Sequence, residues 1–118
     1  MEKFIIQGGR PLKGEVRASG SKNSALPIIA AALLTEHPVT LDNVPRIRDV
    51  DVMAQLLVDL GAEVDGLGTT TIRVRCRNVV KDEPDPALVG RLRGSVLLLG
   101  PLLARRGRAA FLACWEQR

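Results

Sequence analysis

A short polar stretch, SGSKNS at residues 19–24, contains side chains that could bind an anion, and an apolar run follows it at residues 25–34. We expect this stretch to be the turn that opens a helix, where the first N–H groups have no acceptor within the helix. Those donors and the positive end of the helix dipole attract anions. Lys22 adds a positive charge, and Asn23 adds an amide that both donates and accepts. The stretch therefore predicts a phosphate or carboxylate site, and the alternative is an ordinary N-capped helix with a solvated lysine.

Other side chains with catalytic or metal-binding chemistry are few and dispersed. Cys76 and Cys114 are the two cysteines and His37 is the single histidine, so the sequence predicts neither a disulfide framework nor a metal site. Cys76 falls on the apolar face of an expected strand, which favours a buried, unreactive thiol. Asp49 and Asp51 are interpreted as the N-cap and a dipole-stabilising residue of a helix. A catalytic carboxylate pair is the alternative for these two residues.

The composition is typical of a single globular domain. The chain has 118 residues, of which 46% are hydrophobic, 25% charged and only 3% aromatic, so its core must be aliphatic. The apolar runs at residues 25–34 and 96–104 are too short to span a membrane. The first residues lack the pattern of a signal peptide. We therefore expect a cytoplasmic protein with reduced thiols.

The formal net charge of +4 is unevenly distributed along the chain. Residues 91–118 contain six arginines and one acidic residue, Glu116, whereas the first ninety residues carry a net charge of −1. A basic end of this kind is typical of proteins that bind nucleic acid or an anionic ligand. The scarcity of aromatic residues and the lack of a nucleic-acid-binding motif favour the anionic ligand.

Hydrophobic periodicity and turn residues predict an α/β fold in which helices cover a sheet. Strands are expected at residues 4–7, 15–18, 39–41, 63–65, 70–76 and 109–113. Helices are expected from about Asn23 with Pro27 near the first turn, from Asp49 to Gly61, and from Pro86, capped by Asp85, to about Gly107 with a kink or a break at Gly100-Pro101.

Apolar side chains at helical spacing define the face that each expected helix should bury. In chain order, the three sets are Leu26, Ile29, Ala30 and Leu33; Val50, Met53, Ala54 and Leu57; and Val89, Leu92, Val96, Leu99 and Leu103.

Four stretches, in this order, resemble the enolpyruvyl transferase family: GEVRASGSKNSALPIIAAALL at residues 14–34, LDNVPRIRDVD at 41–51, LLVDLGAEV at 56–64 and LRGSVLLLGPLLARRG at 92–107. The resemblance therefore extends to about residue 107. The branch that acts on shikimate 3-phosphate typically has Ser-Lys-Ser where this chain has SKN at residues 21–23. This difference favours the branch that acts on UDP-N-acetylglucosamine in bacterial peptidoglycan synthesis, with the shikimate 3-phosphate branch as the alternative.

The resemblance implies a two-lobed, inside-out α/β barrel built from βαβαββ units. Residues 1–20 would be strands that pair with a second lobe, residues 21–113 part of the first lobe, and residues 114–118 an atypical tail. The implied reaction transfers the enolpyruvyl group of phosphoenolpyruvate to the 3′-hydroxyl of UDP-N-acetylglucosamine and releases phosphate, without a metal or an organic cofactor. Lys22 and Asn23 match residues that contact phosphoenolpyruvate, and Arg93 matches an arginine associated with binding of the sugar nucleotide.

The sequence departs from the family after about residue 107. Relatives continue through a loop with glycine and a reactive cysteine and then an Ile-Gly-x-Arg-Pro segment, whereas this chain reads FLACWEQR at residues 111–118. Cys114 stands near the position of the reactive cysteine, but its neighbours do not match, so it is only a weak candidate. We therefore expect a truncated or frame-shifted N-terminal fragment, inactive alone, whose partner is a missing second lobe. The alternative from another class is a non-enzymatic basic fragment that binds anions or nucleic acid.

Overall fold

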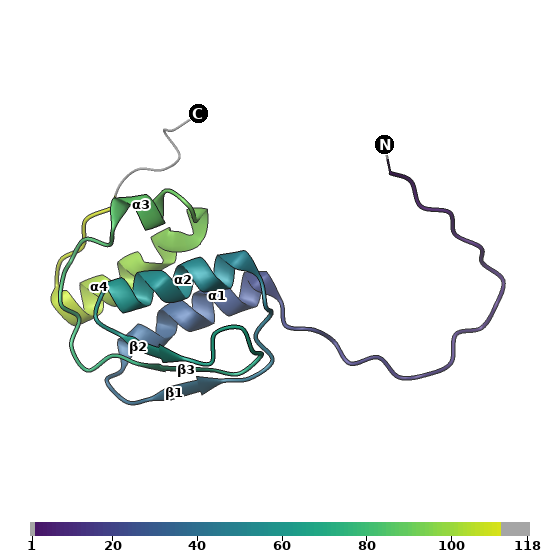
Figure 1. The fold of residues 1–118 in the computed structure, drawn as a ribbon, viewed down its shortest axis with the longest axis horizontal. Coiled ribbons are helices and arrows are strands. Elements are labelled where there is room, and N and C mark those ends of the chain that lie inside the picture. Colours follow the sequence, from purple (N-terminus) through teal and green to yellow (C-terminus); the bar gives the residue numbers. More distant parts are fainter. Residues whose placement is uncertain (1, 112–118) are drawn as a thin grey trace.

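The computed structural model describes residues 2–111, and residues 22–111 form a layered α/β unit. A small sheet makes the first layer, and α1 (Lys22–Ala31) and α2 (Arg48–Asp59) lie against it as the second layer (Figure 1). The 3₁₀ helix η2 (Arg93–Leu98) and α4 (Leu99–Arg106) pack over α1 and the 3₁₀ helix η1 (Ala32–Leu34). The apolar core fills the spaces between these layers.

The sheet has three antiparallel strands in the order β1 (Val39–Leu41), β3 (Ile72–Arg75) and β2 (Glu63–Asp65). Val74 pairs with Val39 on one side and with Val64 on the other, so these side chains share the face that meets the helices. The predicted strand at residues 39–41 and the predicted hairpin of β2 and β3 are confirmed. The arginines of β3 fall on the outer face of the sheet, as the alternation in the sequence predicts.

The predicted apolar faces of the first two helices are confirmed. All eight members of the two sets are buried, and Met53 and Leu57 have no exposed surface. Met53 is therefore part of the core, where its flexible side chain fills space between the helices. α1 packs against α2, and α2 also packs against β2, which fixes the relative positions of the two helix N-termini.

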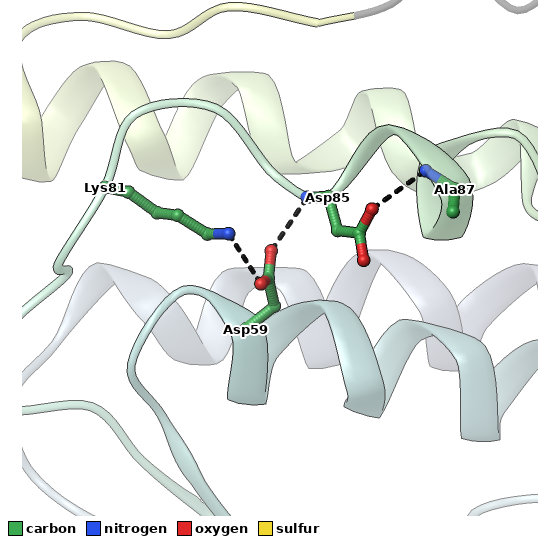
Figure 2. A network of polar contacts seen from close by, with 4 residues as sticks. All are labelled: Asp59, Lys81, Asp85 and Ala87. Carbon is green, nitrogen blue, oxygen red and sulfur yellow. Dashed lines mark hydrogen bonds and ion pairs between the residues drawn. The ribbon is translucent and has the colours of Figure 1, made fainter.

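Asp85 caps α3 (Pro86–Val89), as predicted: its Oδ1 accepts a hydrogen bond from the N–H of Ala87 at 3.0 Å, and Pro86 is the first helical residue. Figure 2 shows how this cap is tied to the end of α2. Asp59 Oδ2 accepts from the N–H of Asp85 at 2.8 Å, and Asp59 Oδ1 lies 2.6 Å from Lys81 Nζ. One carboxylate therefore joins α2 to the segment that leads into α3.

The prediction of one long helix from Pro86, kinked or broken at Gly100-Pro101, is wrong because the break lies near Leu92 instead. The chain leaves the helical conformation between α3 and η2, where Leu92 is extended with φ −139° and ψ 109°. Pro101 is the third residue of α4, where a missing N–H costs no helical hydrogen bond. The break and the tighter 3₁₀ turn shift the buried stripe. Val96, Leu99 and Leu103 are exposed, and the positions buried instead are Ser95, Leu98 and Leu102.

The strands predicted at residues 4–7 and 15–18 are not formed within the described residues 2–20, which extend away from the layered unit (Figure 1). A strand needs a neighbouring backbone to pair its N–H and C=O groups, and this segment has no such neighbour among residues 2–111. Its apolar side chains, such as Phe4 and Val16, are consequently exposed. The predicted last strand is likewise absent from its described part, residues 109–111, where the N–H of Ala110 donates to the carbonyl of Asp82.

Candidate functional site

A groove of about 550 Å³ opens beside the N-terminus of α1. Three segments that are distant in the sequence line it: the start of α1, the start of α2, and the chain from Arg91 into η2. The groove brings together all three residues that the sequence analysis associated with substrate binding, Lys22, Asn23 and Arg93. These positions are predicted to bind substrate, and the fold places them around one space.

The N-terminus of α1 has the features predicted for an anion site. Ser21 is the extended N-cap residue, and its side chain makes no capping hydrogen bond within residues 2–111. The alternative of an ordinary side-chain cap is therefore not what the structure shows. Lys22 is the first helical residue. Pro27 therefore lies in the second turn of α1, whereas the sequence analysis predicts it near the first turn. Because proline has no N–H, the carbonyl of Asn23 lacks its usual helical donor.

Lys22 forms an ion pair with an acidic side chain at the groove. Its Nζ lies 2.8 Å from Oδ2 of Asp49, and the two side chains are 54% and 31% exposed. Asp49 was predicted to cap α2, but that prediction is wrong because the helix begins at Arg48 and its N-cap residue is Ile47. Asp49 lies instead within the first turn, where its charge suits the helix dipole. The ion pair also shows that the first turns of α1 and α2 lie next to each other.

Sequence reasoning missed Arg91, which lines the groove with Arg93. In a continuous helix two residues separated by one position point about 200° apart, whereas in an extended chain they point the same way. Leu92 is extended and buried, and both arginines are exposed. A predicted helix break at Leu92 would therefore have placed Arg91 beside Arg93. The regular apolar spacing of the sequence gave no indication of this break.

Within residues 2–111, the other arginines of the basic end make contacts inside the chain, and Arg105 makes most of them. Arg105 donates hydrogen bonds to the backbone carbonyls of Leu33, Thr35, Cys76 and Arg77 at 2.6–3.2 Å. Two further arginines also have partners: Arg106 donates to the carbonyl of Val79, and both Arg106 and Arg108 pair with Asp82. These guanidinium groups are engaged within the chain, which counts against a nucleic-acid surface at this end.

Close approach of two loops fixes the turn that enters α1. A Cβ on Gly20 would overlap the carbonyl oxygen of Asn43 and lie 2.8 Å from Cδ of Pro45. Asn43 has a left-handed backbone, with φ 54°, and its Nδ2 donates to the carbonyl of Ala18 at 3.3 Å. The glycine in the predicted anion-binding turn therefore serves packing between loops, and it places Lys22 at the groove.

Two of the remaining candidates from the sequence, Cys76 and His37, lie within the described residues, and neither lines the groove. Cys76 is buried as predicted, its Sγ contacts the carbonyl of Asn78, and burial raises the pKa of the thiol while the charge of Arg105 opposes this. His37 is exposed in a loop, as expected. Cys114 lies outside the described residues. Among residues 2–111, no group of three metal-ligating side chains is found, and none of the helices has the length and apolarity needed to cross a membrane.

We expect Cys76 to resist thiol reagents in the folded chain. Burial favours the neutral thiol, so the pKa of Cys76 is higher in the folded chain than in the unfolded chain. The contribution of this thiol to the free energy of unfolding is therefore lost as the pH rises through the folded pKa. In a Cys114→Ser background, we predict that Cys76 reacts about a hundredfold slower in buffer at pH 8 than in denaturant, because reaction requires local opening. Equal rates, measured with a chromogenic disulfide, would show that the thiol is accessible.

The comparisons with known proteins agree with this fold. The family model described as EPSP synthase (3-phosphoshikimate 1-carboxyvinyltransferase) matches residues 6–114. The chain is 56% identical over 109 residues to the UDP-N-acetylglucosamine 1-carboxyvinyltransferase of Solibacter usitatus. The aligned residues make up 92% of this chain and 26% of that protein. It is 50% identical over 105 residues to the enzyme of the same name from Bradyrhizobium diazoefficiens, covering 89% and 24%. The chain thus spans about a quarter of the length of these relatives.

A solved structure with the same fold is that of the enolpyruvyl transferase NikO from Streptomyces tendae. It matches with a TM-score of 0.70 and 35% sequence identity over 85% of this chain and 23% of that chain. The match confirms the predicted α/β fold of the enolpyruvyl transferases. Together with the family model, which spans most of the sequence, it shows that the chain is a member of the EPSP synthase family of carboxyvinyl (enolpyruvyl) transferases.

Proposed function

We propose that the groove binds phosphoenolpyruvate and UDP-N-acetylglucosamine, as part of the transferase that opens peptidoglycan synthesis. The observation that carries the proposal is the convergence of Lys22, Asn23 and Arg93 on one groove. Lys22 would bind the phosphate of phosphoenolpyruvate, Asn23 would orient that substrate, and Arg93 would bind an anionic oxygen of the sugar nucleotide. A guanidinium fork suits phosphate oxygens, and Arg91 offers a second such fork beside it.

The proposed reaction forms one C–O bond and breaks another. The 3′-hydroxyl oxygen of the sugar adds to the central carbon of phosphoenolpyruvate, a proton goes to the methylene carbon, and the hydroxyl proton goes to a base. Elimination then breaks the C–O bond to phosphate and restores the double bond, so inorganic phosphate leaves. Positive charges at the phosphate stabilise the charge that develops during this departure.

The groove supplies binding and electrostatic stabilisation rather than proton transfer. Asp49 is the only carboxylate among the residues that line it, and this carboxylate is paired with Lys22. General acid and base catalysis requires groups within hydrogen-bond reach of the reacting protons. We therefore propose that the 118-residue chain binds substrates but releases no phosphate by itself, and that turnover needs groups beyond this groove.

UDP-N-acetylglucosamine is preferred to shikimate 3-phosphate as the acceptor in this proposal. The relatives of this chain at 44–56% identity bear the name UDP-N-acetylglucosamine 1-carboxyvinyltransferase. The family model bears the name of the shikimate enzyme, which keeps that substrate as the alternative. A competition assay distinguishes the two acceptors. Unlabelled UDP-N-acetylglucosamine should displace a labelled sugar nucleotide from the groove, and shikimate 3-phosphate should not.

Titration calorimetry with phosphoenolpyruvate tests the role of Lys22. We predict that Lys22→Gln weakens binding at least tenfold, because a charge-assisted hydrogen bond to phosphate contributes about 1.5–3 kcal/mol. Lys81→Gln is the matched control, since Lys81 also pairs with an aspartate, Asp59 (Figure 2). Lys81 is not among the residues that line the groove. If both variants bind like the unaltered chain, or both weaken equally, the groove is not the phosphate site.

A further inference from the structure

The N-terminal arm, residues 2–20, is a partly apolar segment that leaves the folded unit. Figure 1 shows the arm running away from the sheet and the helices. Phe4, Ile5 and Ile6 are three consecutive large apolar residues, and their exposed fractions are 94%, 81% and 86%. Aromatic and β-branched residues favour a strand, and leaving them in water is unfavourable. The arm therefore has the composition of a strand without the neighbouring backbone that a strand needs.

The sheet has a free edge that suits such a strand. Within the described residues, β1 and β2 are the edge strands, and each pairs only with β3. The edge strand β2 carries Glu63 and Asp65, and charges at an edge discourage pairing with another chain. The edge strand β1, Val39–Leu41, carries no charge. Its three residues match the length of the apolar run at residues 4–6 of the arm.

A pocket of about 290 Å³ lies beside this edge, between α1 and the chain that continues from β1. Leu41 and Val44 line it from the side of the strand, and Ile28 of α1, which is 50% exposed, lines it from the side of the helix. Alternate side chains of a strand point to the same face. A strand added at β1 could therefore place Phe4 and Ile6 against the pocket and cover Ile28.

The start of the arm is held in a way that favours the β1 edge of another copy. Asn43 Nδ2 donates to the carbonyl of Ala18, and Gly20 packs closely against Asn43 and Pro45. The arm leaves the unit from this fixed point and runs outward (Figure 1). Residues 4–6 reach the β1 of their own chain only if the intervening residues reverse direction. The arm of a neighbouring copy needs no such reversal.

We propose that two copies of this chain exchange their arms, so that residues 4–6 of each copy pair with β1 of the other and cover the pocket beside it. This is strand addition at an open sheet edge, in which main-chain hydrogen bonds and side-chain pockets act together. Because the exchange is reciprocal, the two contacts are related by a twofold axis. The exchange is independent of the groove, since the pocket and the groove share no lining residue.

Sedimentation analysis of the full 118-residue chain tests the exchange from the side of the arm. We expect a dimer whose fraction rises with protein concentration. Ile6→Glu should weaken this dimer about tenfold or more, because it places a charge against an apolar pocket. Leu12→Glu is the matched control, since Leu12 belongs to the same arm, is 99% exposed and lies outside residues 4–6. This control should leave the dimer unchanged.

The same measurement tests the pocket. Ile28→Gln should also weaken the dimer, because it replaces the apolar side chain that the arm would cover. Val58→Gln is the control, since Val58 is a helical residue of α2 with a similar exposed fraction, 52%, and does not line the pocket. These side chains are half or more exposed, so all the variants should fold, which circular dichroism checks.

A spin label distinguishes exchange from an arm that folds back on its own chain. We attach it to Glu2→Cys in a Cys114→Ser background, where the remaining thiol, Cys76, is buried. This chain is mixed with a ¹⁵N-labelled chain that carries no spin label. Exchange predicts broadening of the amide signals of β1 and Ile28 in the mixture. An arm folded back broadens them only when both labels are in one chain.

Four results would overturn the exchange. They are a monomer at every concentration, a dimer that Ile6→Glu does not weaken, equal weakening by a variant and its matched control, and broadening confined to doubly labelled chains. None of them bears on the proposed function, because phosphoenolpyruvate binding is measured at the groove, whose residues the exchange does not use.

Discussion

Replacing Arg105 with alanine is expected to lower the free energy of unfolding by about 3 kcal/mol, the larger of the two stability effects predicted for this fold. Arg105 Nη1 donates to the carbonyls at the end of η1, and Nη2 donates to the carbonyls that follow β3. These backbone acceptors come from two segments and are held by a side chain from α4. Removing the guanidinium leaves partly buried acceptors without their donor and disconnects the three elements.

Urea unfolding monitored by circular dichroism measures this effect. Arg105→Lys should recover little of the loss, because an ammonium cannot present two parallel pairs of donors as the guanidinium does. Arg108→Ala is the control, since Arg108 is an exposed arginine of the same basic segment with a single ion pair, and we expect a change below about 0.5 kcal/mol. A loss of less than about 1 kcal/mol for Arg105→Ala would contradict the structural role assigned to this residue.

Gly20→Ala is expected to reduce phosphoenolpyruvate binding and to lower stability by about 2 kcal/mol. The added methyl group would overlap the carbonyl oxygen of Asn43, which is backbone and cannot rotate away as a side chain can. The two loops must separate, and the turn that places Lys22 at the groove moves with them. The binding loss should therefore accompany the stability loss, although Gly20 does not line the groove.

Calorimetry and thermal unfolding of the same sample test both parts of this prediction. Gly100→Ala is the matched control: a Cβ at Gly100 would meet no heavy atom within 4 Å, and the residue lies in α4. Alanine favours a helix over glycine by up to about 1 kcal/mol, so this variant should be as stable as the parent or more so. If Gly20→Ala binds phosphoenolpyruvate normally, the approach of the two loops does not position Lys22.

Several features that depend on local sequence were predicted correctly, although Asp49 is not the N-cap residue of α2. Asp85 caps α3 and Gly107 ends α4 with a left-handed backbone, because caps depend on a few neighbouring residues. Lys22 and Asn23 begin α1 for the same reason. The apolar faces of α1 and α2 follow a regular period that an uninterrupted helix preserves.

Features that depend on tertiary packing were not predicted. The partnership of Lys22 with Asp49 requires two helix N-termini to meet, and nothing in either local stretch indicates that meeting. Arg91 joins the groove because Leu92 leaves the helical conformation, although the apolar spacing from Val89 to Leu103 is compatible with a continuous helix. The strands expected near the N-terminus have the right composition, but a strand also requires a partner backbone.

The measurement that tests the central claim most directly is a titration of the isotope-labelled 118-residue chain with phosphoenolpyruvate, followed through its backbone amide and arginine side-chain NMR signals. The account predicts that the largest shifts occur at Lys22, Asn23 and Arg93, the residues that converge on the groove. Arg73 and Arg75, on the outer face of the sheet beside Glu63 and Asp65, should shift little. If the largest shifts occur at those two arginines, or if the Lys22 and Arg93 signals do not move, the groove is not the binding site.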